Sequence, residues 1–174
     1  MIPVVSPPKA KMKKTYTKEW LSPDEQTDWA WLAGIIDGEG CITITGAQRG
    51  WGWQDILYLG IGMTHKPTID RIVEIIGAGK CHQFDPMKVK SMRGGKIFYS
   101  WYAINKTAGQ IIRLCFPFLV TKKAQAEIAL EYDIILRQCK QKAYHPYPPC
   151  GKALRKYYYR KIRELNGRVK KCAV

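Results

Sequence analysis

The chain has 174 residues, 46% of them hydrophobic, which suffices for one domain with its own core. No stretch approaches the roughly 18 apolar residues of a membrane span, and the N-terminus lacks the pattern of a secretion signal. The six cysteines form no Cys-x-x-Cys pair, which argues against a structural zinc site. We therefore expect an intracellular protein, in the cytoplasm or an organelle matrix, that is not secreted and has reduced thiols.

The net charge of +15 is concentrated at the two ends of the sequence. Residues 1–20 hold five lysines and one glutamate, residues 137–174 hold twelve basic residues and one glutamate, and the stretch between is neutral. Such an excess favours a polyanionic partner, although basic flanks also serve as solubilising surfaces. We predict a flexible basic arm at 1–20, a core domain at 21–144, and a proline-rich linker with a basic helix at 145–174.

The first predicted element is a helix over residues 22–39. Ser22 can cap it, Pro23 suits its first turn, and Glu25 completes a capping box. Small residues recur at every fourth position of this helix, at Ala30, Gly34 and Gly38. A helical face without large side chains lets two helices approach more closely than the usual ~8–10 Å. These three residues would allow a second such helix to pack with its backbone nearly in contact.

From residue 41 the apolar pattern changes to a period of two, which predicts a long hairpin over residues 41–63. If the apolar set faces the core, the opposite set faces outward. The outward set is Thr43, Thr45, Ala47, Gln54, Ile56 and Tyr58. A two-stranded ribbon fits the major groove of DNA, so we expect these residues, with Arg49 of the turn, to contact DNA.

A helix over residues 66–76 precedes a second predicted hairpin, formed by residues 79–84 and 97–104. Alternation suggests an outward, DNA-binding set of Lys80, His82, Phe84, Tyr99 and Trp101. The alternative register places Tyr99 and Trp101 in the core. The loop between the strands is basic and should also contact DNA through Lys88, Lys90, Arg93 and Lys96.

Three further helices are predicted over residues 107–118, 122–144 and 152–166, with a proline-rich breaker at 145–151. The element order is α-ββ-α-ββ-α-α with an additional basic C-terminal helix, an α+β fold with an antiparallel sheet. Basic residues of the last helix are expected to contact phosphates, namely Lys152, Arg155, Lys156, Arg160 and Lys161.

Residues 32–40 read LAGIIDGEG and resemble the motif of the LAGLIDADG homing endonucleases at nearly every position. Residues 116–126, FPFLVTKKAQA, look like that family's Pro-Phe-Leu followed by a lysine-rich helix start. The resemblance implies the homing endonuclease fold, with a saddle-shaped sheet. Because the motif occurs once, the resemblance also implies a homodimer in which two motif helices cross, with Ala30, Gly34 and Gly38 as the dimer interface.

The same resemblance implies the residues of the active site. Glu39 corresponds to the metal ligand in each subunit, the backbone carbonyl of Gly38 to a second ligand, and Asp37 is expected to be structural. Two nearby carboxylates repel unless cations lie between them. The implied metal is Mg²⁺, with Mn²⁺ as a substitute and Ca²⁺ binding without supporting cleavage.

Two further residues match catalytic positions of the family. Lys122 falls where the family has a lysine that contacts the active-site water network, and His65 where it has a polar residue that orders the same water. A solvated helix-start lysine and a surface histidine are the structural alternatives. The family's arginine has no match, and Lys66 or Arg71 could take its place.

The resemblance implies a metal-dependent, staggered double-strand break at a long, near-palindromic DNA site, as in intron homing. Strand lengths suggest that a dimer reads on the order of 16 to 22 base pairs. The alternative is a non-cleaving relative that acts as an intron RNA maturase or a DNA-binding regulator. Glu39 and Lys122 argue against lost cleavage, although maturases can retain both. No membrane partner and no small-molecule cofactor other than metal are expected.

Overall fold

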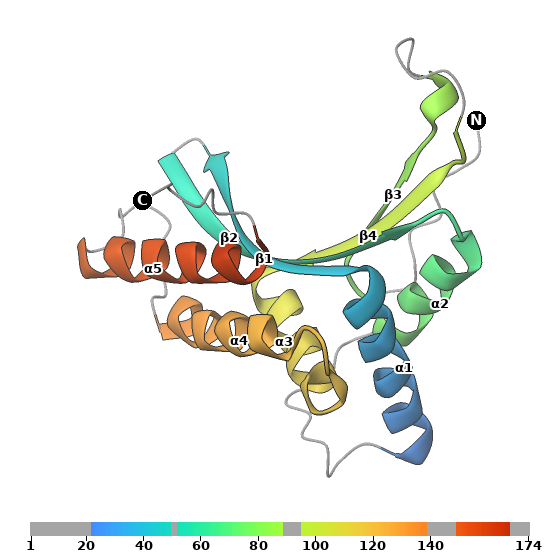
Figure 1. The fold of residues 1–174 in the computed structure, drawn as a ribbon, viewed down its shortest axis with the longest axis horizontal. Coiled ribbons are helices and arrows are strands. Elements are labelled where there is room, and N and C mark those ends of the chain that lie inside the picture. Colours follow the sequence, from blue (N-terminus) through green and yellow to red (C-terminus); the bar gives the residue numbers. More distant parts are fainter. Residues whose placement is uncertain (1–21, 50–51, 89–94, 139–148, 168–174) are drawn as a thin grey trace.

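The computed structural model describes residues 22–49, 52–88, 95–138 and 149–167, and at 47–49, 52–54, 138 and 149–152 it describes the backbone alone. The elements are α1 (Pro23–Glu39), β1 (Gly40–Arg49), β2 (Gly52–Met63), α2 (Lys66–Ile76), β3 (Lys80–Phe84), β4 (Phe98–Ile104), α3 (Asn105–Cys115), α4 (Lys123–Gln138) and α5 (Pro149–Leu165). This order confirms the predicted α-ββ-α-ββ-α-α arrangement with an additional C-terminal helix (Figure 1).

Helix α1 begins with the predicted capping box. The Ser22 hydroxyl accepts a hydrogen bond from the Glu25 N–H at 3.3 Å, and the Glu25 carboxylate accepts one from the Ser22 N–H at 2.9 Å. The helix ends at Glu39, and β1 starts at the next residue. Gly40 permits this direct connection, because a Cβ there would lie 2.6 Å from the Ile36 carbonyl oxygen.

The four strands form one antiparallel sheet in the order β1-β2-β4-β3. Figure 1 shows α1 to α4 beneath this sheet, while the β1–β2 and β3–β4 hairpins rise at opposite ends, so that the sheet is saddle-shaped. In the described part of the chain no helix covers the upper face, which we call the open face. The α+β fold class is confirmed.

The core lies between the lower face of the sheet and the helices. Strand β2 contributes Leu57, Leu59 and Ile61, and α1 contributes Leu32 and Ile36, each at most 2% exposed. Burial of this apolar area is the dominant stabilising contribution to the fold. It also fixes which face of β2 remains open, because successive side chains of a strand alternate between the two faces.

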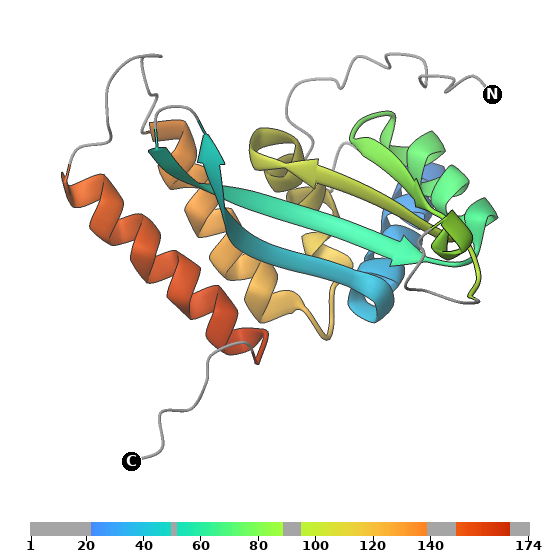
Figure 2. The same cartoon turned by 90° about the horizontal axis from the view of Figure 1, so that it is seen from above.

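Strand β4 has the alternative register. Trp101 is 1% exposed, its indole N–H donates to the Ala78 carbonyl at 2.9 Å, and Tyr99 packs against the same core. The prediction that Tyr99 and Trp101 face outward is wrong. The indole fills the space beneath the turn before β3, where a Cβ on Gly79 would collide with it. The residues of β4 on the open face, which Figure 2 shows from above, are Phe98, Ser100, Tyr102 and Ile104.

The C-terminal helices differ from their predicted bounds by a few residues. Helix α3 starts two residues earlier and gives way to a short 3-10 turn at Phe116–Phe118. Helix α4 is described to Gln138, and the remainder of its predicted range lies outside the described residues, as do the 1–20 arm and residues 145–148 of the linker. None of the described helices is both long and apolar enough to cross a membrane.

Helix α5 packs onto the same core beside α4 and the edge strand β1. Ile162 is fully buried, and the Asn166 amide donates to the Ile42 carbonyl at 3.0 Å. Arg155 is only 3% exposed, with its guanidinium 6.0 Å from the centre of the Tyr132 ring. The prediction that Arg155 contacts phosphate is therefore wrong, because this side chain belongs to the inner stripe of the helix.

Candidate functional site

The end of α1 is fastened to the start of α4 by the side chain of Asp37. One carboxylate oxygen accepts from the Val120 N–H at 2.7 Å and the other from the Lys122 N–H at 2.8 Å. Residues more than eighty positions apart in sequence are thus held together. This agrees with the expectation that Asp37 is structural.

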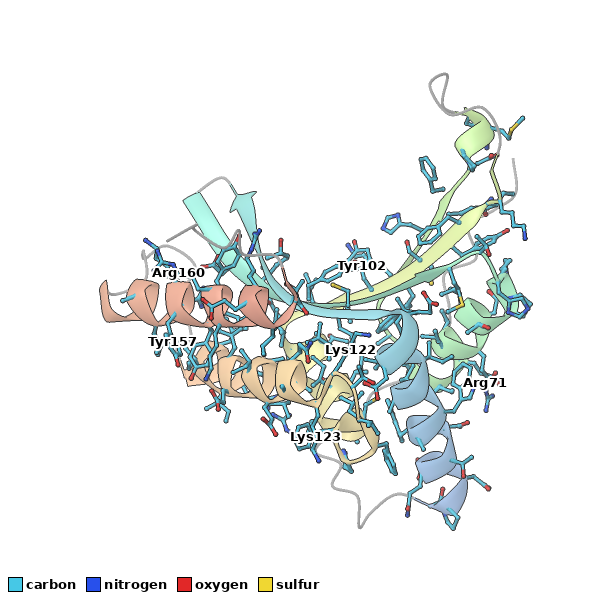
Figure 3. All side chains as sticks on the ribbon, viewed as in Figure 1. Arg71, Tyr102, Lys122, Lys123, Tyr157 and Arg160 are labelled. Atoms are coloured by element: carbon cyan, nitrogen blue, oxygen red, sulfur yellow. The ribbon has the colours of Figure 1, made fainter. Side chains whose placement is uncertain are left out.

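Lys122 completes a reciprocal contact. Its ammonium donates to the carbonyl oxygens of Ile36, at 2.9 Å, and Asp37, at 2.6 Å (Figure 3). The C-terminal end of a helix carries partial negative charge, and the last turn of α1 has no basic residue of its own. Lys122 supplies the missing cation from another element. The Lys122 side chain is half-buried, and its ammonium is held at the carbonyl of Asp37, two residues before Glu39.

The electrostatics of Asp37 reflect this contact. Burial alone would raise the pKa of its carboxyl, but the N–H groups of Val120, Lys122 and Thr121, together with the Lys122 ammonium, lower that pKa below its ordinary value. Asp37 is therefore an ionised acceptor at neutral pH. It holds the loop that delivers Lys122.

Glu39 is the last residue of α1, and its side chain is exposed. Gly34 and Gly38 are exposed too, and a Cβ added to either would meet nothing within 4 Å. Ala30, one turn earlier, is half-buried. In a single chain the small-residue face of α1 is therefore open, as a surface that packs against a second copy must be.

The donor set at this end of α1 suits a hard divalent cation. It combines the Glu39 carboxylate with backbone carbonyls at the negative end of a helix, and such cations prefer oxygen ligands. Among the described residues, no group of three or more His, Cys, Asp or Glu side chains could hold a metal ion. One chain offers Glu39, and a two-fold related copy would offer its equivalent.

His65 is exposed at the end of β2, directly before α2. Its Nδ1 lies 2.8 Å from the Thr68 hydroxyl, so Nε2 is the ring nitrogen that faces other partners. Neither proposed substitute for the family's arginine is free of ion pairs. Lys66 bonds to Asp70 at 2.6 Å, and Arg71 bonds at 2.6 Å to Asp28.

The position of Arg71 excludes it from the end of α1. Its partner Asp28 precedes Glu39 by eleven residues, which corresponds to about 16 Å along a helix. Its second partner, Glu74 at 2.8 Å, belongs to α2 itself. Arg71 therefore connects α2 to the middle of α1.

The open face of the sheet carries a row of stacked rings that crosses three strands. Tyr58 of β2 stacks on Tyr102 of β4 with ring centres 5.6 Å apart, and Tyr102 stacks on His82 of β3 at 5.4 Å. We call these three residues the aromatic ladder; Tyr102 at its centre lies above the sheet in Figure 3. The sequence prediction included Tyr58 and His82 but missed Tyr102, because it assigned the residues of β4 to the wrong faces of the sheet.

The other predicted DNA-binding residues are placed as follows. Lys80 and Phe84 share the face of His82 and are exposed, as are Lys88 and Lys96 near the β3–β4 loop, and Thr45 is half-buried. Thr43 pairs with Tyr58 and so lies on the open face as expected, but it is only 6% exposed, so the expectation that it is accessible to DNA is wrong. Lys90 and Arg93 lie outside the described residues, as do the side chains of Ala47, Arg49, Gln54 and Lys152.

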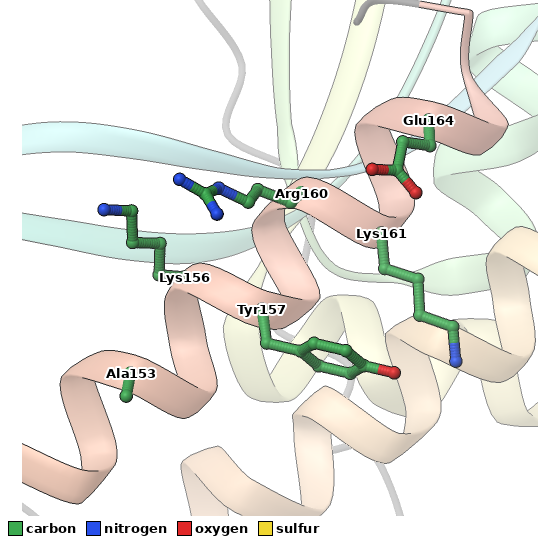
Figure 4. Close-up of a pocket in the computed structure, with 6 residues that line it drawn as sticks. All are labelled: Ala153, Lys156, Tyr157, Arg160, Lys161 and Glu164. Carbon is green, nitrogen blue, oxygen red and sulfur yellow. The ribbon is translucent and has the colours of Figure 1, made fainter.

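Helix α5 presents basic side chains along a surface pocket (Figure 4). Lys156 and Arg160 are exposed and extend from the helix toward the β1–β2 side, whereas the Lys161 ammonium lies 5.5 Å from the centre of the Tyr157 ring. The pocket is lined by Ala153, Lys156, Tyr157, Arg160, Lys161 and Glu164. Among the predicted phosphate contacts whose side chains are described, Lys156 and Arg160 are thus the most accessible.

Comparison with known structures identifies the fold. The homing endonuclease I-CvuI, solved with its DNA target in the presence of Ca, superposes with a TM-score of 0.65 at 22% identity, over 87% of this chain and 88% of that one. It has also been solved with Mg and uncleaved DNA. The archaeal intron-encoded homing endonuclease I-Vdi141I, bound to DNA, gives 0.53 at 14% identity, over 82% of this chain and 98% of that one.

The LAGLIDADG homing endonuclease I-GzeII, in complex with its DNA target, gives a TM-score of 0.55 at 18% identity, over 78% of this chain and 43% of that one. No family model matches the sequence, and no curated protein is similar to it. The structural likeness shows that the chain has the fold of the LAGLIDADG homing endonucleases. The motif at residues 32–40 forms the end of helix α1 and the first residue of β1.

Proposed function

We propose that this chain, which has the LAGLIDADG homing endonuclease fold, is a site-specific DNA endonuclease that acts as a homodimer with divalent metal. The observation that carries the proposal is the end of α1, where an exposed Glu39 adjoins an open glycine face. The structural neighbours I-CvuI and I-GzeII, both solved with DNA targets, support it.

The surface of α1 supports the proposal of a homodimer. Gly34 and Gly38 leave the backbone uncovered, so the helix of a second copy can approach it closely. Two-fold packing of this face brings the two Glu39 carboxylates together. Their mutual repulsion favours a bound cation, and the substrate should be near-palindromic because the protein is symmetric.

Glu39 and the Gly38 carbonyl would hold the metal, for which Mg²⁺ is the proposed ion, with Mn²⁺ able to replace it. When bound, such an ion lowers the pKa of a water molecule and stabilises the leaving oxygen of a phosphodiester. The reaction would leave a staggered double-strand break in the DNA. Ca²⁺ should bind without supporting cleavage.

Lys122 and His65 would assist from the protein side. The Lys122 ammonium is held at the end of α1 by two carbonyls, so its charge would be preorganised beside the scissile phosphate. His65, with Nδ1 on Thr68, presents Nε2 to solvent and can orient a water molecule.

DNA would lie along the saddle of the open face. The aromatic ladder and the exposed Lys80 contact bases in the major groove, while Lys156 and Arg160 of α5 contact phosphates beside the β1 edge. The sheet therefore supplies sequence specificity. The flanking helix supplies much of the affinity.

The test is cleavage of a duplex selected by the protein from a randomised library, in the presence of Mg²⁺. The Glu39→Gln variant should bind this duplex with the wild-type affinity but cut it more than about 100-fold more slowly, because it loses a metal ligand. Glu127→Gln is the matched control, since Glu127 is exposed on α4 and its replacement makes the same change of charge outside α1.

Normal cutting by Glu39→Gln would refute the role of Glu39. Specific binding without cutting by the wild-type protein, in either Mg²⁺ or Mn²⁺, would favour a DNA-binding regulator. Tight binding of a structured RNA in preference to every duplex would favour a maturase.

A further inference from the structure

Two phenylalanines lie side by side on the open face near the tip of the β3–β4 hairpin. Phe84 of β3 and Phe98 of β4 are directly paired in the ladder, and they are 45% and 40% exposed. We call them the phenylalanine pair. Paired apolar rings with this exposure on a face without a helix are costly to leave in water.

Only one of the two rings has a structural explanation. The ring of Phe98 lies over Gly62 of β2, where an added Cβ would collide with it, so Phe98 covers a stretch of bare backbone. Phe84 belongs to β3, the edge strand of the sheet. Its exposed ring continues the surface that Phe98 begins.

The surroundings of the pair indicate what covers it. Lys80 lies four residues before Phe84 and so on the same face of β3. Lys96 and Lys88 are exposed at the two sides of the hairpin loop, and the Lys88 ammonium lies 4.0 Å from the Asp85 carboxylate, which leaves the lysines in excess. Cations around an apolar centre match a DNA groove, in which phosphates border the edges of the bases.

The chemistry of the rings then selects the base. Phenylalanine has no hydrogen-bond donor or acceptor, so the pair cannot read the hydrogen-bonding pattern of a base edge. The apolar group in the major groove is the C5-methyl of thymine. The aromatic ladder differs here, since its tyrosine hydroxyls and histidine nitrogens can hydrogen-bond to any base.

We infer that the phenylalanine pair reads thymine methyl groups and makes this end of each half-site methyl-dependent. The inference rests on the proposed function, because it assigns part of the specificity of the same DNA-binding face.

The experiment replaces each thymine of the selected duplex in turn by deoxyuridine, which removes the methyl group and leaves the hydrogen-bonding edge unchanged. Dissociation constants are measured at one salt concentration for the wild type, Phe84→Leu and Phe84→Ser. For at least one thymine per half-site, wild-type binding should weaken about fourfold per methyl removed, as loss of one buried carbon predicts.

Phe84→Ser should lose most of the preference for thymine over deoxyuridine, because only Phe98 of the pair remains, whereas Phe84→Leu should retain most of the preference because it keeps an apolar side chain. Ile134→Ala on α4, half-exposed beneath the sheet, is the control and should keep the full preference. Thermal unfolding of each variant verifies that the fold is intact.

Two results would overturn the inference. One is equal binding of thymine and deoxyuridine by the wild type at every position, and the other is an undiminished preference in Phe84→Ser. A protein that selects no duplex sequence at all would instead refute the proposed function, which separates the two failures.

Discussion

Helices α1 and α5 have the same length, 17 residues each, and opposite charge. α1 contains five acidic and no basic residues, whereas α5 contains six basic residues and one acidic residue, so that their net charges are −5 and +5. A phosphate backbone repels the first and attracts the second. The proposed function assigns phosphodiester cleavage to α1, which needs a cation beside DNA. It assigns much of the binding affinity to α5.

The two helices also differ in which face is covered. The inner stripe of α5, with Arg155 and Ile162, is buried against α4 and β1. α1 buries Leu32 and Ile36 but leaves its glycine face open. Under the proposed function, the glycine face of α1 is the surface that would pack against a second copy, and the basic face of α5 is the surface that would contact DNA.

The largest expected effect comes from covering the glycine face of α1 with the side chain of Gly34→Leu. The side chain has room in the isolated chain, so the fold should persist while the dimer is lost, and cleavage should fall more than about 100-fold because each site keeps one Glu39. Light scattering after size-exclusion chromatography measures the mass.

Gly40→Ala is the contrasting variant, since its Cβ would collide with the Ile36 carbonyl and destabilise the chain itself. If Gly34→Leu remained a dimer, the small-residue face would not be the interface.

Next in size is Asp37→Asn, which tests how α1 is fastened. An amide keeps one acceptor oxygen where the carboxylate has two and loses the charge, so we expect a loss of about 1–3 kcal/mol in the free energy of unfolding. Cleavage should fall further than DNA binding, because Lys122 is no longer fixed. Denaturant unfolding and the two DNA assays measure these quantities; Asp24→Asn, exposed in the first turn, is the control.

A smaller effect is expected on α5, where neighbouring basic residues have different roles. Replacing Lys156 and Arg160 together by alanine should reduce the slope of log affinity against log salt by about 2, roughly one unit for each phosphate contact. Arg155→Met should leave that slope unchanged and alter only stability, because Arg155 is buried over Tyr132. An equal slope change in both variants would contradict this division of α5.

The smallest effect is on acid stability. The lowered pKa of Asp37 means that its ionised form stabilises the fold above the ordinary value near 3.9, and that this contribution is lost as the pH falls below that value. Wild-type stability should therefore decline more steeply below about pH 4 than that of Asp37→Asn. Thermal melts from pH 6 to pH 3 give both curves, and parallel curves would contradict the role of the carboxylate.

Local patterns predicted much of the fold. The capping box of α1 and the period-two strands depend on neighbours in sequence, and they appear where expected. Which residues of β4 face the core was not predictable in the same way. Its residues 98–104, FYSWYAI, are mostly aromatic or apolar on both faces, and the choice is made by the fit of Trp101 beneath Gly79, which is far from β4 in sequence.

At the candidate site the motif located Glu39 and the glycine face, but the contact between Asp37 and Lys122 joins residues 85 apart and leaves no trace in either local pattern. Arg155 is different, because a signal existed. It lies on one helical stripe with Tyr158, Tyr159 and Ile162, at spacings of three, four and seven residues, which predicts an inner position. Its charge outweighed that spacing in the prediction.

The direct connection from Glu39 to Gly40 has a mechanical consequence. The helix that would cross its partner and the strand that would follow the DNA groove are one continuous lever, without a hinge between them. In a two-fold dimer, the separation of the two reading sheets is then set by the crossing of the helices. Such a dimer would hold its two reading sheets at a fixed distance. One base pair inserted at the centre of the DNA site should therefore abolish recognition, even though every contacted base is still present in the sequence.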